Sequence, residues 1–298
     1  MAEDPARPIG SQASAWAVSY ARTPDASLAP APAGKVRVEL LTDPYSVWCW
    51  GFEPVRRALE HRYPSVEFRP LLGGMFERLP DPQGIGFDVE RFFAAVQRTT
   101  GMPIRGDAAT RDRATSTYPA CVHVHAARLV APDRERTYLR ALREAVYLDA
   151  RNVSRVEVAA DVAASVGIDE DEFREAVATG EPEREFRGAL AGVESLNLRA
   201  YPTLLVTWGE RTARVEGFQS LPALLGVVQF LTGTLLVPAP PPLLAAALPA
   251  GERVATREVA EVLGVSMEDA HEQLLEALRR GDVTRERYAT GDVWLRRE

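Results

Sequence analysis

Two strand-rich segments, separated by about 110 residues of helical character, constrain the fold of this chain more than any other feature. In the first, a predicted strand over 35–42 leads through a helix over 47–62 to a second strand over 66–72. In the second, a β-hairpin over 203–215 precedes a helix over 221–231. Neither segment can close a hydrophobic core alone, so we predict that the two pair in one sheet across the helical insertion.

The first segment has the order of a parallel β-α-β unit, because both strands are largely apolar and a helix joins them. Pro54 lies inside that helix and lacks a backbone N–H, so we expect a kink there. The second segment completes the sheet with a hairpin and packs a last helix against it. The predicted class is therefore α/β, with a sheet domain interrupted by helices.

The insertion is expected to consist of amphipathic helices with polar outer faces. This pattern recurs over 88–99, 117–130, 134–148, 155–166, 170–179 and 183–195. Asp133, Ser154 and Asp169 stand where N-caps are expected, since their side-chain oxygens can accept a hydrogen bond from the first helical turn.

Both ends of the chain differ from this middle part. The N-terminal residues are rich in Ala, Pro and Ser and are expected to form a flexible arm, with a helical turn around Trp16. At the C-terminal end, a proline-rich linker precedes two helices and a hairpin, which is the order of a winged-helix domain. The predicted divisions are 1–34 (arm), 35–105 (first half of the sheet domain), 106–198 (helical insertion), 199–235 (second half) and 236–298 (linker and winged-helix-like domain).

Charge and composition argue against several classes of protein. The net charge is −7 and the isoelectric point is near 5.4, so no basic surface favours nucleic acid or anionic membranes. No uninterrupted apolar run reaches the length of about 18 residues that a membrane-spanning helix needs. Cys49 and Cys121 are too few for a disulfide scaffold, and without an export signal the expected location is the cytoplasm. No cluster has metal-ligand spacing, so no metal site is expected.

The loop over Asp43–Pro54 is the segment expected to carry chemistry. A strand ends there, a tight turn follows, and a helix begins with Ser46 and Cys49 close to its first turn. Free backbone N–H groups and the positive end of the helix dipole stabilise an anion at such a position, above all a thiolate.

This loop resembles the active site of the DsbA-like, FrnE-type branch of the thioredoxin superfamily, whose usual sequence is Asp-Pro-x-Cys-x-x-Cys-Trp-Gly. The matching residues are Asp43, Pro44, Cys49, Trp50, Gly51 and Pro54, followed by Leu71–Gly74 and Ala200–Thr203. The resemblance covers about residues 35–235 and implies a thioredoxin fold with a large helical insertion. It also implies a cis bond between Tyr201 and Pro202, facing Ser46 and presenting backbone to an extended ligand.

The sequence departs from this family at the residue that attacks disulfides. Ser46 replaces the first, exposed cysteine, and Cys49 stands at the second position, which is normally shielded. Dithiol exchange needs one thiolate to attack and a neighbouring thiol to release the product, whereas a serine hydroxyl stays protonated near neutral pH. Cys121 could take part only if its Cα lay within about 6 Å of that of Cys49. We therefore expect no ordinary dithiol activity.

Two interpretations remain open for each residue of the altered motif. Ser46 either caps the helix after loss of redox function or donates a hydrogen bond to a glutathione thiolate, as in the similar kappa-class glutathione transferases and chromene-carboxylate isomerases. Cys49 is either a buried, inert side chain or a regulatory thiol. Ser46 and Cys49 are thus the catalytic candidates, and the predicted ligand-binding residues are Tyr45, Trp48, Trp50, Tyr201 and Pro202.

The leading hypothesis is a redox-silent protein that binds a peptide, a client protein or a thiol between Ser46–Trp50 and Tyr201–Pro202. One group in this branch delivers client proteins to an ATP-dependent protease, and the appended domain fits such an adaptor. The alternative is a glutathione-dependent transferase or isomerase that uses Ser46, with glutathione as its ligand. A third hypothesis is a DNA-binding regulator, which the acidic second helix of the C-terminal domain disfavours. The sequence leaves open whether any oxidoreductase-like or transferase activity remains and whether the chain forms a homodimer.

Overall fold

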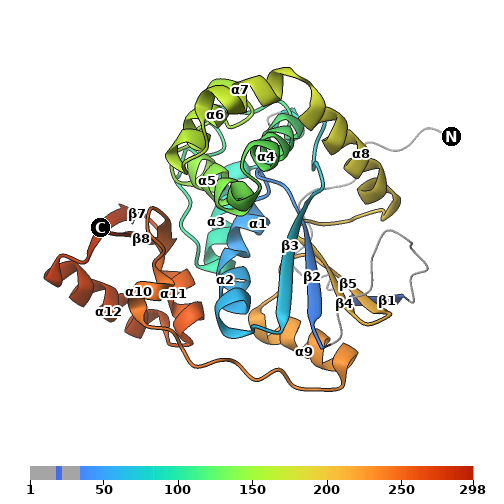
Figure 1. Cartoon of the computed structure of the whole chain (residues 1–298). Helices are drawn as coiled ribbons and strands as arrows, with labels where there is room; N and C mark the ends of the chain where they lie inside the picture. Colours follow the sequence, from blue (N-terminus) through green and yellow to red (C-terminus); the bar gives the residue numbers. More distant parts are fainter. Residues whose placement is uncertain (1–17, 22–33, 83, 298) are drawn as a thin grey trace.

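One mixed β-sheet organises the larger part of the molecule. The computed structural model describes residues 18–21, 34–82 and 84–297. In this part of the chain the larger sheet has the order β1-β5-β4-β2-β3 (Figure 1). Its strands are β1 (Val18–Ala21), β2 (Val36–Thr42), β3 (Val66–Leu72), β4 (Thr203–Trp208) and β5 (Arg211–Glu216).

The two predicted halves pair through β2, whose residues are all buried except the half-buried Glu39. β2 runs parallel to β3, with Leu40 opposite Pro70, and antiparallel to β4, with Leu41 opposite Thr203. The predicted pairing across the insertion is thus confirmed. Alternation along β2 sends Leu40 to the face covered by the helices after β2 and β5, and Leu41 to the face covered by the last helix of the insertion.

Helices cover both faces of the sheet and one of its ends. Those of the first half and the insertion are α1 (Val47–Gly51), α2 (Glu53–Arg62), α3 (Val89–Thr100), α4 (Tyr118–Val130), α5 (Glu135–Tyr147), α6 (Val156–Ser165), α7 (Glu170–Ala178) and α8 (Glu181–Ser195), with a 3₁₀ turn at Pro132–Arg134. α9 (Leu221–Thr232) follows the hairpin. The insertion forms its own apolar core beyond the ends of β2 and β3 (Figure 1). No helix of the described residues is long and apolar enough to cross a membrane.

The helix predicted over 47–62 is in fact two helices that meet at Phe52. Pro54 follows in the first turn of α2, where its missing N–H cannot bond to the carbonyl of Trp50. The N–H of Phe52 ends α1 by donating to the carbonyl oxygens of Trp48 and Cys49, at 3.0 and 3.3 Å. Phe52 keeps helical backbone angles, with φ −84° and ψ −11°, so the expected kink is a one-residue interruption between α1 and α2.

The N-terminal arm contains a strand that was not predicted from the sequence pattern. Val18–Ala21 forms β1 and pairs antiparallel with β5, with Val18 opposite Val215. The predicted flexible arm did not include this strand. The helical turn predicted around Trp16 lies outside the described residues.

The C-terminal unit, which we define as residues 244–297, has its own core around the fully buried Trp294. Its elements are α10 (Leu244–Ala247), β6 (Arg253–Ala255), α11 (Thr256–Leu263), α12 (Met267–Arg280), β7 (Val283–Tyr288) and β8 (Gly291–Arg296). The two helices and the hairpin occur in the predicted order. The short strand β6 was not predicted, and it extends the hairpin to a sheet of order β6-β8-β7.

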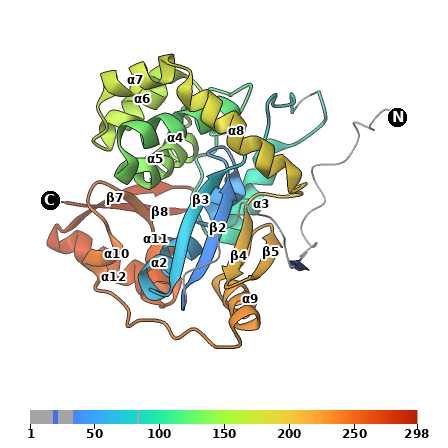
Figure 2. The same cartoon turned by 45° about the vertical axis from the view of Figure 1, so that its right-hand side comes forward.

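This unit packs tightly against the rest of the molecule. α11 lies along α2, as the two views of Figures 1 and 2 agree, and the hairpin contributes Val293 to the core of the insertion. Ion pairs join the two parts: Arg140 of α5 donates to the buried Glu258 of α11 at 2.7 and 3.0 Å, and Arg57 of α2 donates to the half-buried Glu252 at 2.7 Å. The C-terminal unit is therefore an integral part of the folded molecule.

Candidate functional site

Ser46 is the N-cap of α1, and its side chain is only 3% exposed. Its backbone is extended, and its Oγ accepts a hydrogen bond from the N–H of Cys49 at 3.3 Å. This is the arrangement that a capping serine adopts at the start of a helix. The hydroxyl therefore satisfies the helix end and lies beneath the surface.

Cys49 is the middle residue of the short helix α1, and it is only 1% exposed. Burial raises the pKa of its thiol, although Arg143 and a hydrogen bond to Ser46 act in the opposite direction. A nucleophilic cysteine requires the reverse, a lowered pKa and an exposed sulfur. The geometry supports the interpretation of Cys49 as a buried, unreactive side chain.

Asp43 holds the loop in place from below. Its Oδ1 accepts from the N–H of Tyr45, and its Oδ2 accepts from the N–H of Met75 and the hydroxyl of Thr117, each at 2.7 Å. Burial raises the pKa of this carboxyl group. Asp43 matches the family motif, but no role for it was predicted from the sequence; its position between an apolar strand and a proline was the available signal.

Cys121 lies under the same loop. Its Sγ is 3.6 Å from Oδ2 of Asp43, and both burial and the neighbouring carboxylate raise the pKa of the thiol. Cys49 and Cys121 are both free thiols. The insertion helix α4 thus places a second thiol beside Asp43, where it packs as a small buried side chain.

The prediction that Trp50 lines a ligand groove is wrong. Its ring is fully buried, its Nε1 donates to the carbonyl of Pro103 at 2.9 Å, and it stacks on Tyr147. The guanidinium of Arg140 lies 4.4 Å from the ring centroid. Trp50 points from α1 into the core of the insertion because that face of α1 meets α3 and α5.

Tyr45 and Trp48 remain half-buried at the rim of the loop. The hydroxyl of Tyr45 donates to Oδ1 of Asn152 at 2.8 Å and accepts from the N–H of Ser154 at 3.0 Å. Trp48 packs on Phe92 and Phe218, with ring centroids 6.4 and 5.9 Å away. Tyr45 therefore ties the loop to the insertion, and Trp48 bridges the two halves of the sheet domain.

The loop before β4 meets the end of β2. The Tyr201–Pro202 bond is cis, and the pairing of Leu41 with Thr203 places Pro202 beside Thr42. The carbonyl of Pro202 accepts from the N–H of Gly217 at 2.8 Å. The structure thus brings this loop next to the segment that leads to Ser46.

The side chain of Tyr201 fills space at the end of β3. A Cβ atom at Gly73 would overlap its phenol ring, so only glycine allows this close approach. Burial and the nearby Asp43 raise the pKa of Tyr201. The space above the loop is thus partly occupied by the protein itself.

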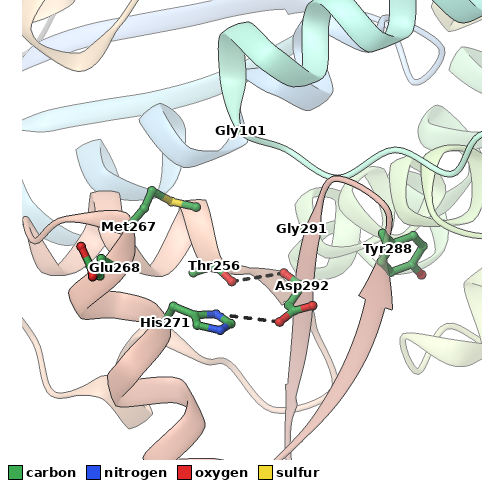
Figure 3. A pocket seen from close by; sticks show the side chains of 8 residues that line it. All are labelled: Gly101, Thr256, Met267, Glu268, His271, Tyr288, Gly291 and Asp292. Carbon is green, nitrogen blue, oxygen red and sulfur yellow. Dashed lines mark hydrogen bonds and ion pairs between the residues drawn. The ribbon is translucent and has the colours of Figure 1, made fainter.

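Two cavities in the described part of the chain lie away from the Ser46 loop. One of about 490 Å³ opens between the end of α3 and the C-terminal unit, and Figure 3 shows its lining. His271 faces Asp292 there, with Nδ1 and Oδ2 3.8 Å apart. A second, of about 350 Å³, lies between Tyr63 and Val265. Neither is lined by Ser46 or by the Tyr201–Pro202 loop.

No metal site is formed by the residues that the structure describes, since no three His, Cys, Asp or Glu side chains gather in a suitable group. His123 and His125 both lie on α4 but have separate partners. His123 Nδ1 is 3.0 Å from the carbonyl of Val153, and His125 Nδ1 is 2.8 Å from the guanidinium of Arg128.

The family model described as thioredoxin matches residues 40–224. The chain belongs to the thioredoxin family. Its fold is similar to that of a putative protein disulfide isomerase from Nitrosomonas europaea, with a TM-score of 0.58 and 23% identity over 66% of this chain and 97% of that one. A probable DsbA oxidoreductase from Streptomyces coelicolor is also similar, with a TM-score of 0.54 and 21% identity over 66% of this chain and 90% of that one. The predicted thioredoxin fold with a helical insertion is thus confirmed.

The sequence matches to two relatives are longer than the thioredoxin domain. The ClpXP adapter protein SpxH from Halalkalibacterium halodurans is 26% identical over 242 residues, which cover 78% of this chain and 79% of the relative. The protein of the same name from Shouchella clausii is 23% identical over 278 residues, which cover 91% of this chain and 92% of the relative. A match over 91% of this chain necessarily includes part of the C-terminal unit.

Proposed function

We propose that this thioredoxin-family chain is an adaptor that binds other proteins and has no dithiol exchange activity. The observation that carries the proposal is the match to two ClpXP adapter proteins over 79% and 92% of their lengths. The proposed partners are a client protein and a ClpXP-type protease.

The altered motif supports the redox-silent part of the proposal. In dithiol exchange, a thiolate attacks a client disulfide, one client sulfur leaves as a thiolate, and a second protein thiol then releases the other client sulfur as it closes a protein disulfide. Ser46 cannot make the attack, and Cys49 is buried with a raised pKa. One thiol without a reacting neighbour cannot complete the cycle.

The proposed client surface lies where Trp48 and the Tyr201–Pro202 loop meet the end of β2. Trp48 and Tyr201 are half-buried, so each presents part of an aromatic ring at this rim. Pro202 is buried and its carbonyl accepts from Gly217, so the proposed contacts with a client are made by the half-exposed rings of Trp48 and Tyr201. Trp50 is excluded from this surface by its burial.

Insulin reduction tests the redox-silent proposal directly. With dithiothreitol present, the chain is expected to reduce insulin no faster than the reductant alone, whereas Ser46→Cys restores the two-cysteine motif and should raise the rate. The matched control is Ser195→Cys, a new thiol on the exposed end of α8. Turnover by the unaltered chain at the rate of a dithiol oxidoreductase would contradict the proposal.

Binding to purified ClpXP tests the adaptor proposal separately. The full chain is expected to bind immobilised ClpX, and a chain that shows no binding at the highest soluble concentration would not be such an adaptor. The glutathione alternative is tested on immobilised glutathione. Because the Ser46 hydroxyl caps α1, we expect no retention; retention that disappears in Ser46→Ala would favour the transferase or isomerase instead.

A further inference from the structure

The segment Leu235–Leu243 joins α9 to α10 and runs as an extended strap along the lower edge of the molecule in Figures 1 and 2. It contains no helix or strand, and four of its nine residues are prolines, at 238 and 240–242. Proline fixes φ near −65°, and the residue before a proline is confined to extended ψ values. Sterics alone therefore hold most of the strap in the polyproline II region. Leu243, with φ −65° and ψ 152°, has these values.

Exposure along the strap repeats every three residues. Leu236, Ala239 and Pro242 are half-buried, and the six residues between and beside them are exposed. A polyproline II helix has three residues per turn, so residues three apart share one edge. The strap is thus a polyproline II helix that lies on the domain along one edge.

Specific contacts fix this edge. The N–H of Ala239 donates to the carbonyl of Arg62 at 2.6 Å, and Nε of Arg62 donates to the carbonyl of Ala239 at 2.7 Å. Leu236 packs against the core between the sheet and α9. The strap is therefore held in one conformation before any partner arrives, which lowers the entropy lost on binding.

The two remaining edges are apolar and face solvent. One contains Val237, Pro240 and Leu243, of which Val237 and Leu243 are 81% and 83% exposed. The other contains Leu235, Pro238 and Pro241, so that Pro238 and Pro241 have the spacing of a PxxP segment. A spacer would need neither the exposed aliphatic side chains nor this spacing. Exposed apolar surface of this kind marks a site of interaction.

We propose that the strap is a preformed ligand for a partner protein whose groove is lined by aromatic side chains. Such grooves bind polyproline II segments by accepting two of the three edges, and these are the two that the strap presents. The proposal concerns a surface separate from the Ser46 loop, and it holds whether or not the chain is an adaptor.

The test uses the full chain and three immobilised domains that read proline-rich segments: an SH3, a WW and an EVH1 domain. At least one is expected to bind with a Kd between about 10 µM and 1 mM. Pro238→Ala combined with Pro241→Ala should weaken that binding at least tenfold, and Val237→Asp should weaken it through the other edge. Pro132→Ala, at an exposed proline far along the chain, is the control and should bind as before.

Two results would overturn the proposal. One is the absence of binding to all three domains at millimolar concentration. The other is unchanged binding by the double variant and by Val237→Asp, which would place the contact elsewhere. Far-ultraviolet circular dichroism of each variant, expected to match the unaltered chain, ensures that a loss of binding reports on the strap.

Discussion

At the scale of single residues, hydrogen bonds to buried side-chain oxygens fix the conformation of the loop over Asp43–Pro54. Ser46 caps α1, and Asp43 accepts three hydrogen bonds that fasten the loop to the end of β3 and the start of α4. The residue at the family's reactive position, Ser46, is therefore not the one that holds the loop in place. The carboxyl group of Asp43 fixes the loop, and the hydroxyl of Ser46 caps the first turn of α1.

Asp43→Ala should strongly destabilise the protein, because it leaves buried N–H and O–H donors without acceptors. Each such donor costs about 1 to 3 kcal/mol, so we expect a loss of at least 3 kcal/mol in the free energy of unfolding, measured by urea denaturation. Asp133→Ala, at an aspartate 80% exposed, is the control and should change it by less than about 0.5 kcal/mol. Equal effects of the two substitutions would disprove this role for Asp43.

His123 should make the protein less stable in mild acid. Burial lowers its pKa from 6.5 to about 4, so between these values the unfolded chain binds a proton that the folded chain does not. Stability from this group is therefore present above pH 6.5 and is lost as the pH falls towards 4, by about 2 to 3 kcal/mol. His123→Asn, which can still donate to Val153, should show a smaller difference between pH 7 and pH 4.5. An unchanged difference would refute the assignment.

Residue-level prediction succeeded where the cause is local. Pro54 interrupts the helix, and Asp169 caps α7 through the N–H of Glu172. It failed where the cause is distant. The burial of Trp50 depends on residues some 50 and 100 positions away, and Ser154 is drawn to Asn152 and Tyr45, so that Arg155 is the N-cap of α6. Asp133 lies in a 3₁₀ turn and does not cap α5.

At the scale of elements, the approach of α1 to α3 depends on Gly51. A Cβ atom there would lie 2.5 Å from Cγ2 of Thr100, which is closer than carbon atoms pack. The helix that follows the loop can therefore lie against α3 only with glycine at this position.

Gly51→Ala is expected to destabilise the protein by about 1 to 3 kcal/mol through overpacking. In a Thr100→Ser background, which removes the clashing methyl group, the same change should cost less. Gly188→Ala is the matched control: this glycine lies within α8 with nothing near its Cβ position, so alanine should stabilise by up to about 1 kcal/mol. Thermal unfolding of the four variants measures these differences, and an equal cost in both backgrounds would exclude Thr100 as the cause.

Long elements were predictable and short ones were not. The helices of the insertion and the strands of the sheet show clear periodicity, and their ends differ from prediction by few residues. β1 and β6, with four and three residues, carry too little pattern to be seen. Each is defined by its partner, β5 for the first and β8 for the second, and pairing over such a distance leaves no local signal.

At the scale of the whole molecule, the C-terminal unit is docked by charge as well as by apolar contacts. Glu258 is fully buried and accepts from Arg140 and from the N–H of Ala255. The sequence could not reveal this docking, because arginine and glutamate on amphipathic helices normally face solvent. Only the position of α11 against α2 and α5 explains why these charges are inside.

Glu258→Gln should weaken the docking of the C-terminal unit on the rest of the molecule, because it removes a negative charge next to the buried guanidinium of Arg140. Removing one partner of such a pair costs about 3 kcal/mol or more, so we expect faster proteolytic cleavage in the strap and a lower unfolding midpoint. Glu286→Gln, which affects a half-exposed pair with Arg253, is the control and should cost less than about 1 kcal/mol. Identical cleavage rates for the two variants would argue against docking by Glu258.

The ion pairs between the two parts also bear on how this protein can be divided. A fragment ending at the strap would keep Arg57 but lose Glu252 and Glu258, the carboxylates that neutralise it from the other side. Its second helix would then bear an uncompensated positive charge on a surface newly opened to water. Experiments on an excised thioredoxin domain would therefore report on a protein with a different charge on this face. Loss of the C-terminal unit in a relative would have to be accompanied by substitutions on this face of α2.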